Sequence, residues 1–173
     1  MLLFTNTLTR KKEKFLTAKD KPVSLYVCGI TPYDFAHIGH GRCYVTFDFV
    51  YRLLKFLGYE VTYCRNFTDI DDKTIRRSQE EKRPLVDLTD EYTQAFFDDL
   101  KTLNMLLAHH YPRATEFIPQ MIETIQKLEE KEYTYTTNDG SVFFKISQFP
   151  NYGKLANLDP DQLKSGERVE TDE

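Results

Sequence analysis

The sequence predicts an α/β fold in which helices cover a parallel β-sheet. Two short segments rich in β-branched and aromatic residues, 23–28 and 60–67, read as strands, and a long apolar segment, 44–57, lies between them. A strand, a helix and a strand in succession form a right-handed crossover unit, which places both strands parallel in one sheet. With 173 residues, of which 40% are hydrophobic, the chain is long enough for one main domain.

The boundaries of these elements have local signals. The first strand follows Pro22 and stops at Gly29. The central segment is too long for a strand and is apolar nearly all round, which is typical of a buried helix, and Gly58 is a common helix terminator. Because ligands of such sheets bind at the carboxyl ends of the strands, we expect the functional site where the two strands end.

The second half of the sequence predicts helices followed by a hairpin. Apolar residues recur there at helical spacing, and we interpret these stripes as faces packed in the core. The step Asp139-Gly140 suits a hairpin turn. The expected helices cover 71–82, 85–107 and 115–131, the expected strands cover 133–137 and 142–147, and a short helix is expected from Leu158.

Composition excludes several classes of protein. No run of about 18 apolar residues occurs, so no transmembrane helix is expected, and the N-terminus lacks the pattern of a secretory signal, so we expect a cytoplasmic protein. The net charge of −4 combines a mildly basic first half with an acidic second half, which suits either a nucleotide or RNA partner or an ordinary solvated surface. Cys28, Cys43 and Cys64 form no CxxC pair, which argues against a disulfide framework and a four-cysteine zinc site.

The segment 28–41, between the first strand and the buried helix, is rich in residues that commonly bind ligands or take part in catalysis. Its glycines allow close approach of a ligand, and a helix beginning near 37–40 offers N–H groups and a positive dipole end to phosphate. His37 and His40 share a helix face, and both can donate hydrogen bonds to phosphate oxygens. Two other interpretations stay open: His37, His40 and Cys28 bind a transition metal, or the histidines satisfy only local hydrogen bonds.

A second polar segment, 65–73, follows the second strand and should face the loop that follows the first strand. Thr68 and the acidic residues after it can hold a polar substrate, for example through an amino group. The same residues suit a helix start, with Thr68 or Asp69 as the N-cap and Asp71 and Asp72 in the first turn. A magnesium site built from these carboxylates is a further alternative.

Several motifs in one order resemble the cysteinyl-tRNA synthetases, a family of class I aminoacyl-tRNA synthetases. The residues His-Ile-Gly-His at 37–40 resemble the HIGH signature of the class, and the flanking segment 26–34 narrows the resemblance to the cysteine enzymes. The resemblance runs through the whole chain and implies a Rossmann-like catalytic domain, with 1–83 as its first half and 84–173 leading into a connective insertion. Further segments agree with the same family: 4–10, 66–73 and 112–115.

The resemblance also implies an activity, in which ATP with Mg²⁺ activates cysteine to cysteinyl-adenylate before transfer to tRNA(Cys). His37 and His40 would contact ATP and stabilise the charge that develops on its phosphates, while Gly39 and Gly41 let the nucleotide approach. Cys28 matches a ligand of the family's Zn²⁺ ion, which binds the substrate thiolate and so rejects serine. The matched positions that line the amino-acid pocket are Gly29, Thr31 and Thr68.

The family's other zinc ligands and its KMSKS loop lie beyond the segments that this sequence matches. We therefore expect the chain to be the N-terminal portion of a monomeric enzyme, and to be inactive alone. Two alternatives remain. One is an enzyme that joins cysteine to an amino-sugar, which shares the activation step, and the other is a non-catalytic module that binds a nucleotide or RNA.

Overall fold

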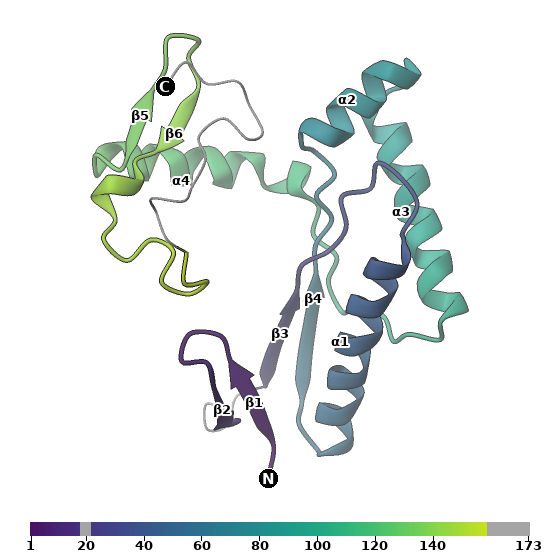
Figure 1. The fold of residues 1–173 in the computed structure, drawn as a ribbon. Coiled ribbons are helices and arrows are strands. Elements are labelled where there is room, and N and C mark those ends of the chain that lie inside the picture. Colours follow the sequence, from purple (N-terminus) through teal and green to yellow (C-terminus); the bar gives the residue numbers. More distant parts are fainter. Residues whose placement is uncertain (18–21, 159–173) are drawn as a thin grey trace. The chain divides into compact units, whose positions relative to one another are not determined.

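The computed structural model describes residues 1–17 and 22–158 (Figure 1). Its contacts divide the chain into two compact units. One unit comprises Thr17–Met121, and the other combines Met1–Leu16 with Ile122–Glu173. The first unit contains the expected strand–helix–strand segment, and it therefore positions the candidate site.

A parallel pair of strands forms the centre of the first unit. β3 (Val23–Val27) pairs with β4 (Val61–Arg65) in parallel, and α1 (Ile38–Phe56) connects them. This arrangement confirms the predicted α/β class. The helix begins within the histidine motif, as predicted, and ends just before Gly58, whose left-handed φ of 84° suits a residue without a side chain.

A further segment extends the sheet beyond β4. Cys64 and Phe67 form isolated parallel bridges with His110 and Arg113, respectively. The amide of Phe67 also donates to the carbonyl of Pro112 at 2.9 Å. No strand was expected here from the sequence, because single bridges leave no alternating pattern of apolar residues.

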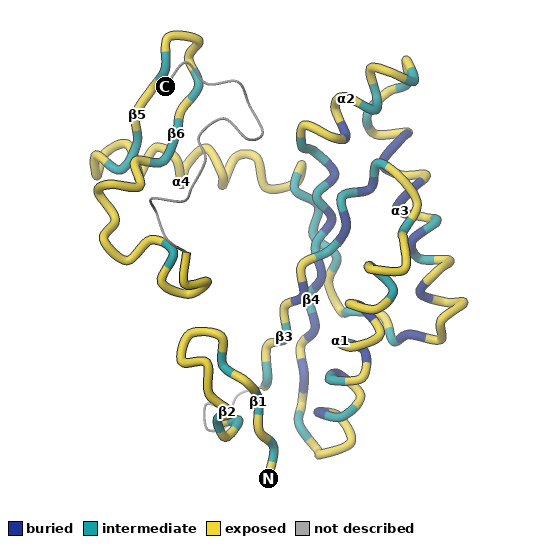
Figure 2. The backbone as a smooth tube through the Cα atoms, in the orientation of Figure 1, coloured by how far each residue is buried: buried dark blue, intermediate teal, exposed yellow. Residues whose placement is uncertain are grey.

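Side chains alternate across β4, so that one face of the sheet is buried. Val61, Tyr63 and Arg65 are buried, whereas Thr62 is exposed. The dark blue stretches of β4 in Figure 2 mark its buried part. The Tyr63 ring packs against Tyr51 of α1, with ring centroids 5.0 Å apart. Removal of this aromatic surface from water helps to hold α1 on the sheet.

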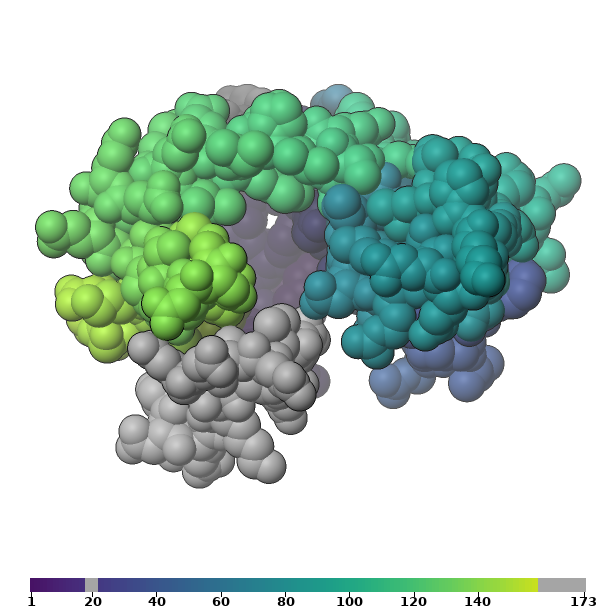
Figure 3. All heavy atoms as spheres, turned by 90° about the horizontal axis from the view of Figure 1, so that it is seen from above, coloured from purple at the N-terminus to yellow at the C-terminus, as the bar shows by residue number. Residues whose placement is uncertain are grey.

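Two further helices complete the first unit: α2 (Asp72–Glu81) and α3 (Leu85–Thr102), whose atoms form one continuous teal surface in Figure 3. α3 ends before the predicted position 107, because Asn104 has a left-handed φ of 52° that a helix does not continue through. The chain is then anchored to α1, since the amide of Leu106 donates to Asp48 at 2.8 Å. The predicted core stripe of α3 is confirmed for four residues that are buried: Leu88, Tyr92, Phe96 and Leu100. The fifth predicted residue, Leu103, is exposed.

The second unit is built from short elements. Its first hairpin, β1 (Leu3–Asn6) and β2 (Lys11–Lys14), was not predicted, because β2 consists only of charged residues and gives no strand signal. The second hairpin is present as predicted, with β5 (Thr134–Thr136) paired to β6 (Val142–Phe144). A short 3₁₀ turn, η2 (Ile146–Gln148), follows.

The helix predicted over 115–131 is divided into a 3₁₀ turn, η1 (Ala114–Phe117), and α4 (Ile118–Glu130). Its apolar stripe, expected in the core, is exposed at Met121 and Ile125. The short helix expected from Leu158 lies outside the described residues. Across residues 1–17 and 22–158, no helix has the length and apolarity that a membrane crossing requires.

Candidate functional site

The chain segments that follow β3 and β4 approach each other closely. A Cβ atom built on Gly29 would lie 1.5 Å from the backbone oxygen of Asn66, so only glycine fits this position. The amide of Thr68 donates to the carbonyl of Ile30 at 3.0 Å, which joins the two loops beyond the strands. The predicted residues Gly29 and Thr68 are thus brought together, while Cys28 stands exposed beside Gly29.

His37 is the N-cap of α1 and uses its imidazole as the capping group. Its Nδ1 atom accepts hydrogen bonds from the amides of Gly39, at 3.1 Å, and His40, at 3.4 Å. Its own amide donates to Nδ1 of His40 at 3.2 Å, which completes a capping box. Two helix amides that we expected to be open to an anion are therefore occupied by a side chain.

These contacts determine where each imidazole carries its proton. A ring nitrogen that accepts a hydrogen bond has no proton, so the neutral rings of His37 and His40 both carry it on Nε2. The two rings are stacked, with centroids 3.8 Å apart and planes 15° from parallel. The pair presents two Nε2–H donors at the start of a helix. The local structural role and a phosphate-binding role are compatible, because they use different nitrogens.

We predict that the imidazole of His40 titrates below pH 6.5, its ordinary value. Partial burial, and secondarily the neighbouring His37 ring, lower the pKa of His40. Because the folded-state pKa is below the unfolded value, this group destabilises the fold as the pH falls through 6.5 toward the lowered pKa, and it has no such effect at higher pH. NMR titration of the ring resonances measures the midpoint.

His37→Asn is the matched variant for this titration. The asparagine oxygen keeps an acceptor for the helix cap, but the substitution removes the neighbouring imidazole ring. The titration midpoint of His40 should therefore rise toward pH 6.5. A wild-type midpoint at or above 6.5 contradicts the prediction.

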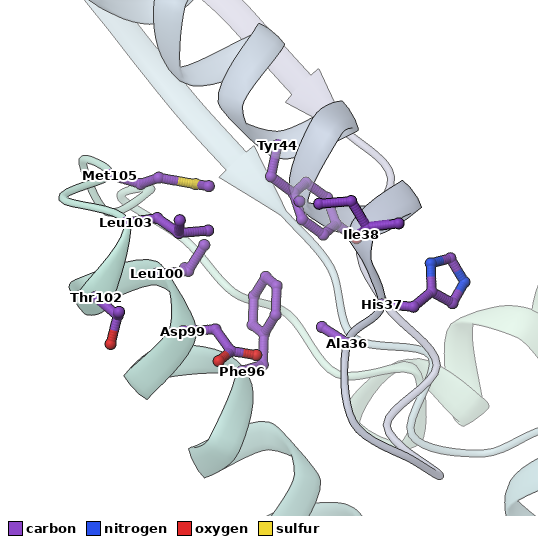
Figure 4. Close-up of a pocket in the computed structure, with 11 residues that line it drawn as sticks. Ala36, His37, Ile38, Tyr44, Phe96, Asp99, Leu100, Thr102, Leu103 and Met105 are labelled. Atoms are coloured by element: carbon purple, nitrogen blue, oxygen red, sulfur yellow. The ribbon is translucent and has the colours of Figure 1, made fainter.

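A pocket of about 270 Å³ opens between the first turn of α1 and the end of α3. His37, the N-cap of α1, and Gly41 in its first turn line one side of the pocket. Phe96 and Leu100 line it from α3 (Figure 4). Its lining is mostly apolar, with a carboxylate from Asp99. The other predicted site residues do not line this pocket. Sequence reasoning missed the α3 residues, because their approach to α1 depends on packing between distant segments.

The acidic residues after β4 mainly serve the fold. Asp69 is 3% exposed and accepts hydrogen bonds from the amide and hydroxyl of Thr115, at 3.0 and 2.6 Å. The N-cap of α2 is Asp71, which accepts from the amide of Lys73 at 2.8 Å, so the expected cap at Thr68 or Asp69 was wrong. Asp69 cannot cap α2, because its carboxylate is engaged with a residue from another part of the chain.

Arg65 is a buried cation near the histidines that was not predicted as a site residue. It is 1% exposed, and its guanidinium carbon lies 4.2 Å from the ring centroid of Tyr44. The Tyr44 ring is in turn nearly parallel to that of His40, with centroids 6.3 Å apart. Arg65 also donates to the hydroxyl of Tyr63. No sequence signal marks this residue, since arginine is rarely buried and its aromatic partners come from other elements.

A family comparison identifies the type of domain. The family model described as "tRNA synthetases class I (C) catalytic domain" matches residues 14–173.

Curated relatives match the chain along its length. It is 49% identical over 99% of its length to a cysteine–tRNA ligase of Chlamydia pneumoniae, and 47% identical over 100% to one of Methanococcus maripaludis. A cysteine–tRNA ligase of Shewanella loihica is 44% identical over 100% of the chain. The chain spans 36–38% of the length of these relatives.

A solved structure shows the same fold. Mycobacterium tuberculosis methionyl-tRNA synthetase, solved in complex with methionyl-adenylate, superposes with a TM-score of 0.58 at 17% sequence identity. The match covers 72% of this chain and 26% of the other. The likeness supports a Rossmann-like arrangement of the sheet and helices.

Proposed function

The chain belongs to the family of class I (C) tRNA synthetase catalytic domains. We therefore propose that it supplies part of an active site that activates cysteine with ATP. The product is cysteinyl-adenylate, which a complete, monomeric enzyme transfers to tRNA(Cys). The cysteine–tRNA ligases at 44–49% identity support cysteine as the amino acid. Residues 1–83 are proposed as the first half of the catalytic domain, and 84–173 as the segment leading into its insertion.

The observation that carries the proposal is the pair of Nε2–H donors on His37 and His40. In the activation step, the carboxylate of cysteine attacks the α-phosphorus of ATP and pyrophosphate leaves, so negative charge redistributes over phosphate oxygens. Donors that are fixed in advance stabilise this charge without reorganising. Both rings are fixed through Nδ1, and the lowered pKa of His40 favours the neutral ring with this hydrogen-bond pattern.

The remaining site residues are assigned to the two substrates. ATP is taken up as its magnesium complex, and Gly39 and Gly41 are proposed to let it approach α1. Apart from its chain neighbours and the backbone of its own helix, no atom lies within 4 Å of a Cβ built on Gly41, so the surface there is open to a ligand. Gly29, Thr31 and Thr68 are proposed to line the cysteine pocket, which fits the hydrogen-bonded loops at the ends of β3 and β4.

Cys28 is proposed as one ligand of a Zn²⁺ ion. Its exposed, free thiol is a suitable donor. A zinc site needs three or more protein ligands, and within the described ranges no three His, Cys, Asp or Glu side chains gather to hold a metal ion. The described residues therefore do not fit a whole zinc site, and no step of the reaction is assigned to the metal.

Cys28→Ser in a complete enzyme carrying this chain is predicted to lower zinc affinity by at least about tenfold, because a serine hydroxyl stays protonated and binds zinc poorly. Zinc content after dialysis against a chelator, measured by atomic absorption, gives the result. Cys43→Ser removes another exposed, free thiol and should retain zinc. Equal zinc contents in wild type and Cys28→Ser would remove Cys28 from the site.

Exchange of labelled pyrophosphate into ATP, with cysteine present, tests the proposed function in a complete enzyme. We expect exchange that depends on cysteine, followed by charging of tRNA(Cys). If exchange occurs without tRNA charging and an amino-sugar consumes the adenylate, the enzyme would instead be one that joins cysteine to an amino-sugar. Binding of ATP without exchange would indicate a non-catalytic nucleotide-binding module.

A further inference from the structure

The carboxamide of Asn66 connects the residues proposed to bind cysteine. Its Oδ1 atom accepts two hydrogen bonds, from the amide of Gly29 at 2.9 Å and from the hydroxyl of Tyr26 at 2.8 Å. Its Nδ2 atom donates to Oγ1 of Thr68 at 3.3 Å. One side chain therefore links the ends of β3 and β4 and contacts both Gly29 and Thr68 of the proposed pocket.

The register of the sheet explains why Tyr26 and Asn66 meet. Tyr26 lies opposite Cys64 in the parallel pair, and side chains alternate along strands, so Tyr26, Cys28 and Asn66 belong to one face of the sheet. The two donors to Oδ1 come from a residue that precedes Cys28 and a residue that follows it. The backbone of Asn66 is also pressed against Gly29, which fixes the base of the side chain.

The chemistry of these contacts favours asparagine at position 66. The side chain must offer an acceptor to two donors and a donor to a hydroxyl oxygen, and a carboxamide provides both. Leucine has a similar size but neither group. Aspartate keeps the acceptors, and the hydroxyl of Thr68 can then reverse its role and donate.

We propose that Asn66 is a positioning residue for cysteine binding, whose carboxamide holds Cys28, Gly29 and Thr68 in place before the substrate arrives. The inference rests on the proposed function, which assigns Gly29 and Thr68 to the cysteine pocket and Cys28 to a zinc ion. A site that is already ordered loses less conformational freedom on binding, so loss of the carboxamide weakens cysteine binding. His37 and His40 are held by their own contacts and retain their action on ATP.

The test compares three variants of a complete enzyme carrying this chain. Asn66→Ala removes the carboxamide, and Asn66→Asp keeps an acceptor for Gly29 and Tyr26. Gln94→Ala removes an exposed carboxamide of α3 that donates to Asp98 at 3.1 Å, and it is the matched control. The KM for cysteine, the KM for ATP and kcat are measured by pyrophosphate exchange, and folding is followed by thermal unfolding.

Asn66→Ala is expected to raise the KM for cysteine about tenfold, with the KM for ATP and kcat within about twofold of wild type. Asn66→Asp is expected to recover most of this loss, and Gln94→Ala to match wild type. Equal changes in kcat and both KM values, or an Asn66→Asp enzyme as impaired as Asn66→Ala, would overturn the inference.

A second measurement separates this inference from the proposed function. If the wild-type enzyme shows no cysteine-dependent exchange, the proposed function fails. Hydrogen exchange of the Gly29 amide, followed by NMR in this chain, still tests the contact itself. Asn66→Ala should speed that exchange at least about tenfold relative to wild type, and an unchanged rate would show that the carboxamide does not hold the loop.

Discussion

Gly29→Ala is expected to destabilise this chain by about 3 kcal/mol or more, which is at the upper end of the range for overpacked sites. The added methyl group would lie 1.5 Å from the backbone oxygen of Asn66. Relief requires the ends of β3 and β4 to separate, which breaks the hydrogen bond between the Gly29 amide and Asn66. Denaturant unfolding of the chain measures the loss as a lower midpoint.

Gly41→Ala is the matched control for this prediction. Apart from its chain neighbours and the backbone of its own helix, no atom lies within 4 Å of a Cβ at Gly41. Alanine is favoured over glycine within a helix by up to about 1 kcal/mol. The control should therefore be as stable as wild type or more stable. Neither glycine has a left-handed φ, so backbone strain does not distinguish the two. Similar losses of stability in both variants would show that the close contact at Gly29 is not the cause.

The strand–helix–strand core was predictable because each of its elements carries its own signal. The apolar run of α1, and the glycine that follows its last turn, specify a helix before any tertiary contact is considered. By contrast, β2 consists of charged residues and pairs only because β1 lies beside it. Such an element has no independent pattern to detect.

Contacts between distant segments limited the prediction of the site. Asp69 and Thr115 are 46 residues apart, and their hydrogen bonds displace the expected helix cap to Asp71. The burial of Arg65 also depends on rings supplied by other elements, such as Tyr44. Residue types and spacing identify which side chains are available, but the choice among their partners is made by packing.

For the histidine motif, the sequence predicts part of the arrangement but not all of it. The spacing of His37 and His40 predicts neighbouring rings, and the rings do stack, although His37 is the N-cap and lies just outside the helix. The spacing does not predict which nitrogen is free, because this depends on the extended backbone at His37, with φ −101° and ψ 171°, which turns its Nδ1 toward the helix amides. Only the structure therefore assigns Nε2–H as the outward donor.

His40→Ala in a complete enzyme is expected to lower kcat for cysteine activation by about 10²–10³-fold, the usual effect of removing a donor aimed at developing charge. The KM for cysteine should change by less than about threefold, because the proposed contact of His40 with ATP would strengthen mainly in the transition state. Pyrophosphate exchange measures both quantities. His110→Ala removes an exposed imidazole elsewhere in the first unit and should leave both unchanged. Equal losses in kcat and cysteine affinity would contradict the assigned role.

Two conservative variants separate the His40 nitrogen that is proposed to contact ATP from the nitrogen that caps the helix. The asparagine side chain in the variant His40→Asn carries an acceptor near the position of Nδ1, so it should keep the hydrogen bond from the His37 amide and the stability of α1. It has no donor at the position of Nε2, and we expect this variant to be nearly as slow as His40→Ala. His40→Gln reaches further and places a donor near Nε2, so it should recover roughly tenfold of the lost rate. If His40→Asn were instead the faster of the two, the imidazole would act through the helix cap and not through contact with the phosphates.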